Sequence, residues 1–319
     1  MKTPLFYRRM TVSRLRKVST VHIWSCETLP SIMTTKKLKP VNKIKVGRYR
    51  PEIHGWRTSH FMLDASDKIA VCGYNDRLNV TFIDLFSGLE PLASKEIYEP
   101  TDRIMWPRFL CFLEKAQLIA TCSDRTLQLY KYEMKMPLDA AALNGEVTCM
   151  ASREEHILIA FFQSRKVDVF DLKLKNIKTI FLEGMDGDWP FEITAIVDPN
   201  KIFVCTTLEN KALQYNDHGF LRCKYNNLTR PELAPMSITV SKQLDQLFIL
   251  WGKEHILVHS LGNNRLLYSF YVDNSHRIRI NLESMLLTIG RMDGDINVYN
   301  PNSAKAARRK SKGDKTISC

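Results

Sequence analysis

The segment "LIATCSDRTLQLYKYE", residues 118 to 133, contains two short apolar runs separated by a polar turn. The runs are rich in Leu, Ile, Thr and Tyr, and the turn between them holds Ser, Asp and Arg. Two runs of this length that are joined by a few turn residues are typical of a β-hairpin. We therefore predict a hairpin at this position.

The same arrangement recurs along the chain. Equivalent first runs are "KIAVCGYNDR", "ILIAFFQSRK", "IFVCTTLENK", "LFILWGKE" and "LLTIGRMDGD". A bulky residue marks each second run, and these markers recur at a nearly constant interval: Ile83, Tyr130, Phe170, Tyr215, His259 and Tyr299. One further run, "TVHIWS" at residues 20 to 25, precedes them at a longer interval and has Trp24 as its marker.

A repeat of roughly 43 residues leaves room for two more strands beside each hairpin, which makes a four-stranded blade. Blades of this kind bury both faces only by stacking in a ring. We therefore predict an all-β chain that forms a β-propeller over residues 20 to 300, with six complete four-stranded blades plus a partial seventh. Because residues 1 to 19 are too few for three strands, we expect the chain to be the C-terminal part of a larger protein, or a gene model that starts inside a blade.

Two of these segments, residues 118 to 133 and "LLTIGRMDGDINVYN" at 286 to 300, resemble the last two strands of a WD-repeat blade. The segment "KIAVCGYNDRLNVTFIDLFSG", residues 68 to 88, is similar to them. The chain departs from the family pattern because it has no Trp-Asp dipeptide and no Gly-His pair at the start of a unit. The resemblance, to a degenerate WD-repeat-like propeller, implies a seven-bladed ring in the full-length protein. It also implies a scaffold on which protein partners dock.

The composition excludes several other classes of protein. With 45% hydrophobic and 10% aromatic residues in 319, the chain can bury a large core and is not a disordered polymer. It contains no apolar run long enough to span a bilayer. Its eight cysteines form no closely spaced pairs and favour a reduced compartment, so we expect an intracellular, cytoplasmic or nuclear protein without a metal or a cofactor.

The net charge of +12 belongs to the two ends of the chain. Residues 1 to 50 hold thirteen Lys or Arg and one acid, and residues 301 to 319 hold six and one. The remainder holds 27 basic and 32 acidic side chains, so the body of the protein is mildly acidic. We therefore expect a basic N-terminal segment at residues 1 to 19 and a basic disordered tail at residues 301 to 319.

The basic tail contains Arg308, Arg309, Lys310 and Lys312, which could bind nucleic acid or an anionic membrane. Two arginines precede a hydroxyl at each end of the chain, and this pattern predicts phosphorylation of Thr11 and Ser311.

Three tryptophans share one spacing along the chain. Trp56, Trp106 and Trp189 each precede a cysteine of a predicted hairpin by the same interval, and these cysteines are respectively Cys72, Cys122 and Cys205. Counting back through the preceding apolar run predicts that each Trp lies just before the second strand of its blade. By resemblance to WD-repeat proteins, this loop opens on the narrow face of the ring, where partners dock.

A tryptophan in this loop can either be exposed for binding or fill the gap between two blades. The charged neighbours favour exposure. We therefore predict a partner-binding surface made of Trp56, Arg57, Trp106, Arg108, Asp188 and Trp189.

No catalytic motif is present in the sequence. The two "MDGD" segments, residues 185 to 188 and 292 to 295, lack the spaced oxygen ligands of a calcium loop and are typical of turns. We predict a non-enzymatic protein-interaction platform that binds one or more protein partners. The alternatives are nucleic-acid or anionic-membrane binding through the basic ends, and the substrate-receptor or sensor end of a larger ubiquitin ligase or signalling protein.

Overall fold

The computed structural model describes residues 109–123, 125–132, 137–197, 200–206, 210–272, 274–280, 287–291 and 295–301, together with residues 39–40 and the backbone of the strands between residues 24 and 97. All regular elements in this part of the chain are β-strands. No helix of the described residues could cross a membrane.

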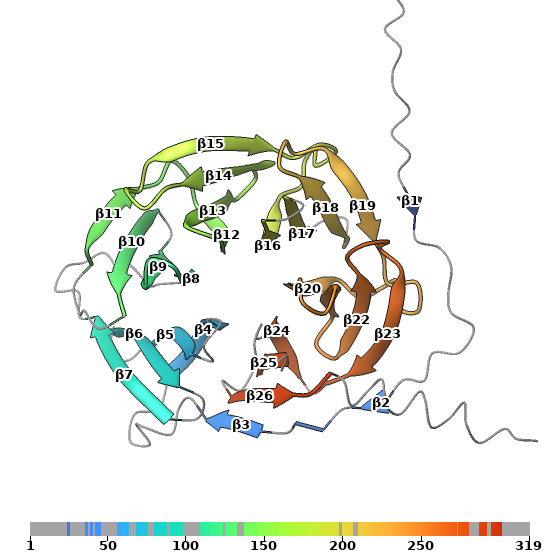
Figure 1. Cartoon of the computed structure of the whole chain (residues 1–319), viewed down its shortest axis with the longest axis horizontal. Coiled ribbons are helices and arrows are strands. Elements are labelled where there is room, and N and C mark those ends of the chain that lie inside the picture. The colour runs from blue at the N-terminus through green and yellow to red at the C-terminus, as the bar shows by residue number, and fades with distance from the viewer. Residues whose placement is uncertain are drawn as a thin grey trace, which may run out of the picture.

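The described strands form six sheets that are arranged in a ring (Figure 1). Five of these blades each contain four consecutive strands. Their bounds are β4 (Trp56–Leu63), β5 (Lys68–Asn75), β6 (Val80–Ser87) and β7 (Glu90–Ile97); β8 (Phe109–Leu113), β9 (Leu118–Cys122), β10 (Thr126–Lys131) and β11 (Asp139–Ala142); β12 (Val147–Arg153), β13 (His156–Phe161), β14 (Lys166–Phe170) and β15 (Asn176–Phe181); β16 (Pro190–Ile196), β17 (Lys201–Thr206), β18 (Ala212–Asn216) and β19 (Leu221–Tyr225); and β20 (Pro235–Ser241), β21 (Gln246–Trp251), β22 (His255–Ser260) and β23 (Leu266–Tyr271).

The sixth sheet closes the ring with strands from the two ends of the chain. It contains β24 (Ser275–Ile280), β25 (Leu287–Arg291) and β26 (Asp295–Tyr299), and its outermost strand is β3 (Asn42–Lys45), which pairs antiparallel with β26. The chain after β26 supplies no fourth strand in the described residues, so the N-terminal part of the chain supplies it. This pairing covers the outer edge of β26 and brings the sixth sheet to four strands, as in the other blades.

The predicted count of six complete blades plus a partial seventh is wrong for the part of the chain that the structure describes. Five blades are built from consecutive strands, and the sixth sheet needs β3. The marker strand around Trp24 contributes only β1 (Trp24–Ser25), which pairs in parallel with β19 as a fifth strand of that blade. A second short strand, β2 (Lys36–Lys37), adds to β23 in the same way. The N-terminal segment therefore runs along the outer edges of two blades before it closes the third.

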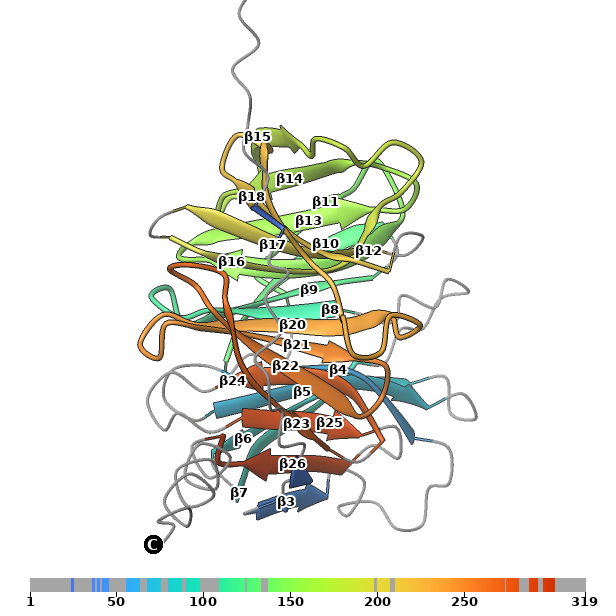
Figure 2. The same cartoon turned by 90° about the vertical axis from the view of Figure 1, so that its right-hand side faces the viewer.

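The first strand of each blade is the innermost one. In Figure 1, β4, β8, β12, β16, β20 and β24 surround the centre, and these strands contact one another around the ring, including β24 with β4. Viewed from the side, the strands run across the thickness of the ring, so their ends and connecting turns lie on its two faces (Figure 2). Because every blade repeats the same order, all the innermost strands begin on the same face.

Burial decreases from the middle strands of a blade to its outer edge. Strands β9 and β21 are buried along their whole length, whereas four of the six residues of β15 are exposed. The predicted hairpins are these buried second and third strands, which explains why they stand out in the sequence as continuous apolar runs.

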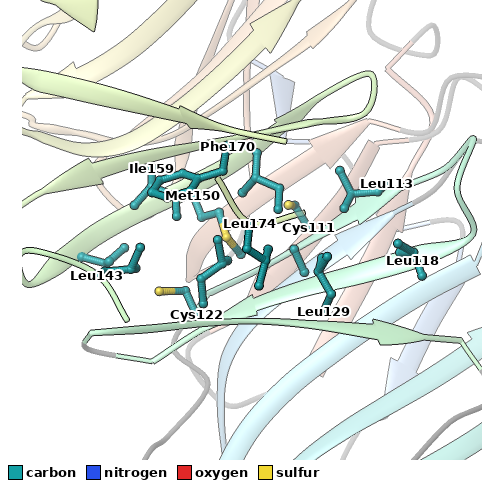
Figure 3. Close-up of a cluster of buried hydrophobic side chains, with 14 of the residues drawn as sticks. Cys111, Leu113, Leu118, Cys122, Leu129, Leu143, Met150, Ile159, Phe170 and Leu174 are labelled. Carbon is teal, nitrogen blue, oxygen red and sulfur yellow. The ribbon is translucent and has the colours of Figure 1, made fainter. Parts of the chain in front are cut away.

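The core consists of apolar layers between neighbouring blades. One layer joins the blade of β8–β11 to the blade of β12–β15, and it contains Cys122, Leu129, Met150 and Ile159 (Figure 3). Three further layers of this kind lie between the successive blades from β12 to β26. Each fully buried Leu or Ile contributes about 1.5–3 kcal/mol. Each described blade is therefore stabilised mainly by its neighbours, as expected for a ring.

Candidate functional site

The candidate site lies where β16 begins, at the junction between the blades of β12–β15 and β16–β19. Trp189, the residue before β16, is half-buried, and its indole contacts the ring of Phe162 edge to face, with 4.8 Å between the ring centroids. Phe162 follows β13 and is 44% exposed. Two aromatic rings from neighbouring blades are therefore held together at the surface.

The loop before Trp189 is a tight turn that is anchored in the core. The side chain of Met185 is buried in the layer between the two blades. The Asp188 amide donates to the Met185 carbonyl over 3.2 Å, and Gly187 has φ of +80°, a conformation that favours glycine. The carboxylate of Asp188 accepts a hydrogen bond from the Trp189 amide at 2.8 Å. This confirms that the first "MDGD" segment is a turn.

The backbone after Trp189 is also fixed. Pro190 is buried, and its carbonyl accepts a hydrogen bond of 2.6 Å from the Thr148 hydroxyl of β12. The start of β16 is therefore tied to the preceding blade by one hydrogen bond and one aromatic contact. We conclude that the scaffold, rather than a ligand, sets the position of Trp189.

A cavity of about 440 Å³ opens beside the indole of Trp189, and the remaining residues that line it are Gln163, Arg165, Met185, Asp186, Gly187 and Asp188. Arg165 and Asp186 form an ion pair at this cavity, and both side chains are largely exposed. An exposed pair of this kind contributes little to stability, so its charges are free to re-pair with a partner. We call Phe162, Gln163, Arg165, Asp186, Gly187 and Trp189 the Phe162–Trp189 surface.

A buried ion cluster lies at the centre of the ring, close to Trp189 along β16. The carboxylate of Glu192 is 2.8 Å from both the Arg277 and the Arg279 guanidinium groups, and the Glu192 side chain is 2% exposed. Glu192, Ser237 and Arg277 are each the third residue of an innermost strand, and Arg279 also donates to the Ser237 hydroxyl. Burial lowers the pKa of Arg279, and the neighbouring carboxylate of Glu192 opposes that shift.

This cluster braces three blades and offers little for a ligand to bind. A second cavity, about 400 Å³, lies at the opposite ends of the innermost strands and is lined by Arg153, Glu154 and Arg279, among others. Arg153 and Arg279 are paired with the largely buried carboxylates of Asp217 and Glu192, and none of the described residues that line this cavity is aromatic. The Phe162–Trp189 surface is therefore the better candidate for partner binding.

None of the described cysteines or histidines is among the residues that line either cavity. Burial raises the pKa of Cys111 to about 12 and holds the pKa values of the Cys149 and Cys205 thiols well above their usual range. These thiols stay protonated and unreactive near neutral pH. Among the described residues, no group of three or more His, Cys, Asp or Glu is arranged to hold a metal ion.

The residues predicted from the sequence to bind a partner differ in their exposure, and several of them lie outside the described part of the chain. Trp189 is half-buried at the surface, whereas Asp188 is buried and acts in the turn. Trp56 and Arg57 are the first residues of β4, of which the structure describes only the backbone. Trp106 and Arg108 lie outside the described residues. The same holds for the basic tail and both phosphorylation sites: Arg308, Arg309, Lys310, Lys312, Thr11 and Ser311.

Two predictions about the tryptophan positions are wrong. Trp189 precedes the innermost strand of its blade, not the second, because the predicted hairpins are the second and third strands and the outermost strand follows them. The shared spacing to a cysteine gives the same strand pairing in two of the three blades but not in the third. Cys122 pairs with Phe109, the third residue after Trp106. Cys205 pairs with Glu192, the third residue after Trp189, whereas Cys72 pairs with His60, the fourth residue after Trp56. Trp56 and Trp189 therefore differ by one position in register.

Sequence reasoning missed Phe162 and Arg165, which belong to the turn after β13. Their signal is in "ILIAFFQSRK", where the apolar run extends one residue past the strand that ends at Phe161. A large apolar side chain in a polar turn is a candidate for a binding surface.

Comparison with protein-family profiles and with curated protein sequences gives no match. Among solved structures, the chain is similar to the β-propeller domain of Cps50 (Swd1) from Myceliophteria thermophila, with a TM-score of 0.59 and 9% sequence identity. The alignment covers 82% of this chain and 99% of that domain. The fold is therefore that of a β-propeller.

Proposed function

We propose that this propeller is a non-enzymatic interaction platform and that protein partners dock on the Phe162–Trp189 surface. The observation that carries the proposal is the aromatic pair, which is fixed by the scaffold, partly exposed and adjacent to a cavity of about 440 Å³. Rigid aromatic side chains next to an arginine are typical of the few residues that dominate binding energy at protein interfaces.

The arrangement also indicates the chemistry of the contact. The cavity can accept one side chain of a partner against the indole, and the exposed Arg165 and Asp186 that line it can pair with charges on the partner. An apolar centre surrounded by charged groups is the usual anatomy of a protein interface. A buried indole at such a centre contributes about 2 kcal/mol or more, so its removal should weaken binding by at least roughly thirtyfold.

The test is quantitative affinity capture from cells, with tagged wild type and the variants Trp189→Ala and Phe162→Ala. We expect both variants to lose the same partners. The matched control is Leu228→Ala, because Leu228 is 44% exposed, like Phe162, but does not belong to this surface. Thermal unfolding of each variant separates lost binding from lost folding. If both variants recover the wild-type partners, the aromatic pair serves packing alone and the proposal fails.

Salt dependence distinguishes this proposal from binding through the basic ends. A partner held on the Phe162–Trp189 surface should remain bound as the salt concentration rises and when residues 1 to 19 and 301 to 319 are deleted. Nucleic acid or an anionic membrane bound through those ends should be released steeply by salt and lost on the deletion.

A further inference from the structure

The outermost strands of the blades differ in what covers their edges. The outermost strands β19 and β23 pair with β1 and β2 respectively, and β26, the third strand of its sheet, pairs with β3. All three added strands come from the N-terminal part of the chain. Within the described residues, no strand pairs with the outer edges of β7, β11 and β15. The protein therefore shows, on two consecutive blades, that an outermost strand accepts a short parallel strand.

The edge of β15 presents unused backbone groups as far as Phe181, whose carbonyl lies against Gly219 in the turn between β18 and β19. Across the ladder with β14, the Leu182 amide donates to the Arg165 carbonyl, so the amides of even-numbered residues in this part of β15 point toward β14. Strand alternation then directs the N–H and C=O of Thr179 and the N–H of Phe181 toward the open edge. None of these three groups has a protein partner among the described residues.

The side chains at this edge are apolar and unusually exposed. Ile177 is 52% exposed and Phe181 is 62% exposed. The ladder between β14 and β15 shifts register at Ile177, so strand alternation relates Phe181 to Thr179 but does not extend to Ile177. The other described open edge with side chains, β11, holds only Asp139 and three alanines. The β15 edge is therefore the one at which an added strand would also bury large apolar side chains.

The charges beside this edge decide what kind of strand it would take. Lys173 and Lys175, in and next to the turn before β15, are exposed and have no ion-pair partner among the described residues. The carboxylate of Asp171 already accepts from the amides of these two lysines at 2.9 Å. The protein's own residues 1 to 19 contain six Lys or Arg and no acid, so they would be repelled here.

From these observations we propose that the outer edge of β15 binds an extended, acidic segment of a partner protein. The segment would add as a fifth strand, in the place that β1 and β2 occupy on the next two blades. Backbone hydrogen bonds to Thr179 and Phe181 would hold it, its apolar residues would cover Ile177 and Phe181, and its acids would pair with Lys173 and Lys175. This surface shares no residue with the Phe162–Trp189 surface, so either proposal can fail while the other stands.

The test uses two synthetic peptides and the full chain. One peptide, acetyl-Glu-Val-Glu-Ile-Glu-Val-Glu-amide, should bind with a dissociation constant of about 1 mM or lower. The second peptide, in which lysine replaces each glutamate, should not bind. Phe181→Pro removes an outward N–H and an exposed ring. Because proline is tolerated at such an edge position, the strand should still form. We expect the variant to bind the acidic peptide with an affinity about tenfold lower than wild type. Ala142→Pro makes the same change at the β11 edge, where Leu143 donates inward to Arg125, and should leave the affinity unchanged.

A charge-reversed variant keeps the test decisive if Phe181→Pro fails to fold. The double variant Lys173→Glu with Lys175→Glu should bind the acidic peptide more weakly than wild type does, and it should bind the lysine peptide. No binding of the acidic peptide to wild type, or equal binding to all variants, would overturn the proposal. A tenfold gain in affinity on deleting residues 1 to 19 would also overturn it, because the protein's own N-terminus would then be the occupant.

Discussion

Removing the carboxylate of Glu192 should destabilise the whole ring. This carboxylate is the shared partner of Arg277 and Arg279 on β24, at 2.8 Å from each, and it also contacts Ser237 on β20, so it links its own blade to two others. All three charged side chains are largely buried. Glu192→Ala would remove the carboxylate that pairs with these two buried guanidinium groups.

The expected loss is about 3–5 kcal/mol, which is typical when one partner of a buried ion pair is removed. The assay is unfolding in urea, monitored by far-UV circular dichroism. The urea concentration at the midpoint is compared between variants that share the same dependence of free energy on urea concentration. Glu154→Ala is the matched control, because Glu154 pairs with Lys115 at 3.4 Å on the exposed surface, and its loss should cost less than about 1 kcal/mol. If the free energy of unfolding of Glu192→Ala is within about 1 kcal/mol of the wild-type value, the ion cluster does not brace the blades and this reasoning is wrong.

Three further predictions concern the core and the closure of the ring. Burial lowers the pKa of His259 to about 4 from 6.5, so this residue should cost up to roughly 3 kcal/mol of stability as the pH drops from 6.5 to 4. His259→Phe should make the pH profile of unfolding shallower but not flat, because burial also lowers the pKa of His255 to about 4. The buried thiols should resist iodoacetamide in the native state and react after unfolding, as judged by peptide mass spectrometry; rapid native labelling would show that the blades are not packed as described. These thiols are Cys111, Cys122, Cys149, Cys205 and Cys223. Lys45 and Asp295 are paired residues of β3 and β26. The double variant Lys45→Cys with Asp295→Cys should therefore form an intramolecular disulfide on oxidation, detected as a linked peptide in the monomer. Absence of this disulfide would contradict the pairing of β3 with β26.

The repeated hairpins were predictable from sequence because they are the most buried strands. The segment at residues 118 to 133 has the apolar runs that two-faced burial demands, and its equivalents share that signal. The outermost strands lack it: β11 reads "DAAA", with mostly exposed residues. The period therefore indicates the length of a blade, but it does not say which strand faces the centre. For this reason the sequence-based prediction places the tryptophans one strand too far out.

Contacts between distant parts of the chain carried no local signal. The closing strand β3 reads "NKIK", and nothing in this short segment indicates that it pairs with β26, near the opposite end of the sequence. Glu192 and Arg277 are likewise 85 residues apart, and only the ring brings them together. Of the candidate site, Trp189 was predictable from its repeated spacing, whereas Phe162 depends on the packing of one blade against the next.

The most direct test of the proposed function is site-specific photocrosslinking in cells. A photoreactive phenylalanine analogue placed at Phe162 lies against Trp189 at the edge of the cavity, and the same analogue at Leu228 is equally exposed elsewhere. We predict that position 162 gives discrete crosslinks to one or a few proteins, that Trp189→Ala abolishes them, and that position 228 does not give them. Identical crosslinks from both positions, or crosslinks at 162 that persist in Trp189→Ala, would contradict docking on the Phe162–Trp189 surface.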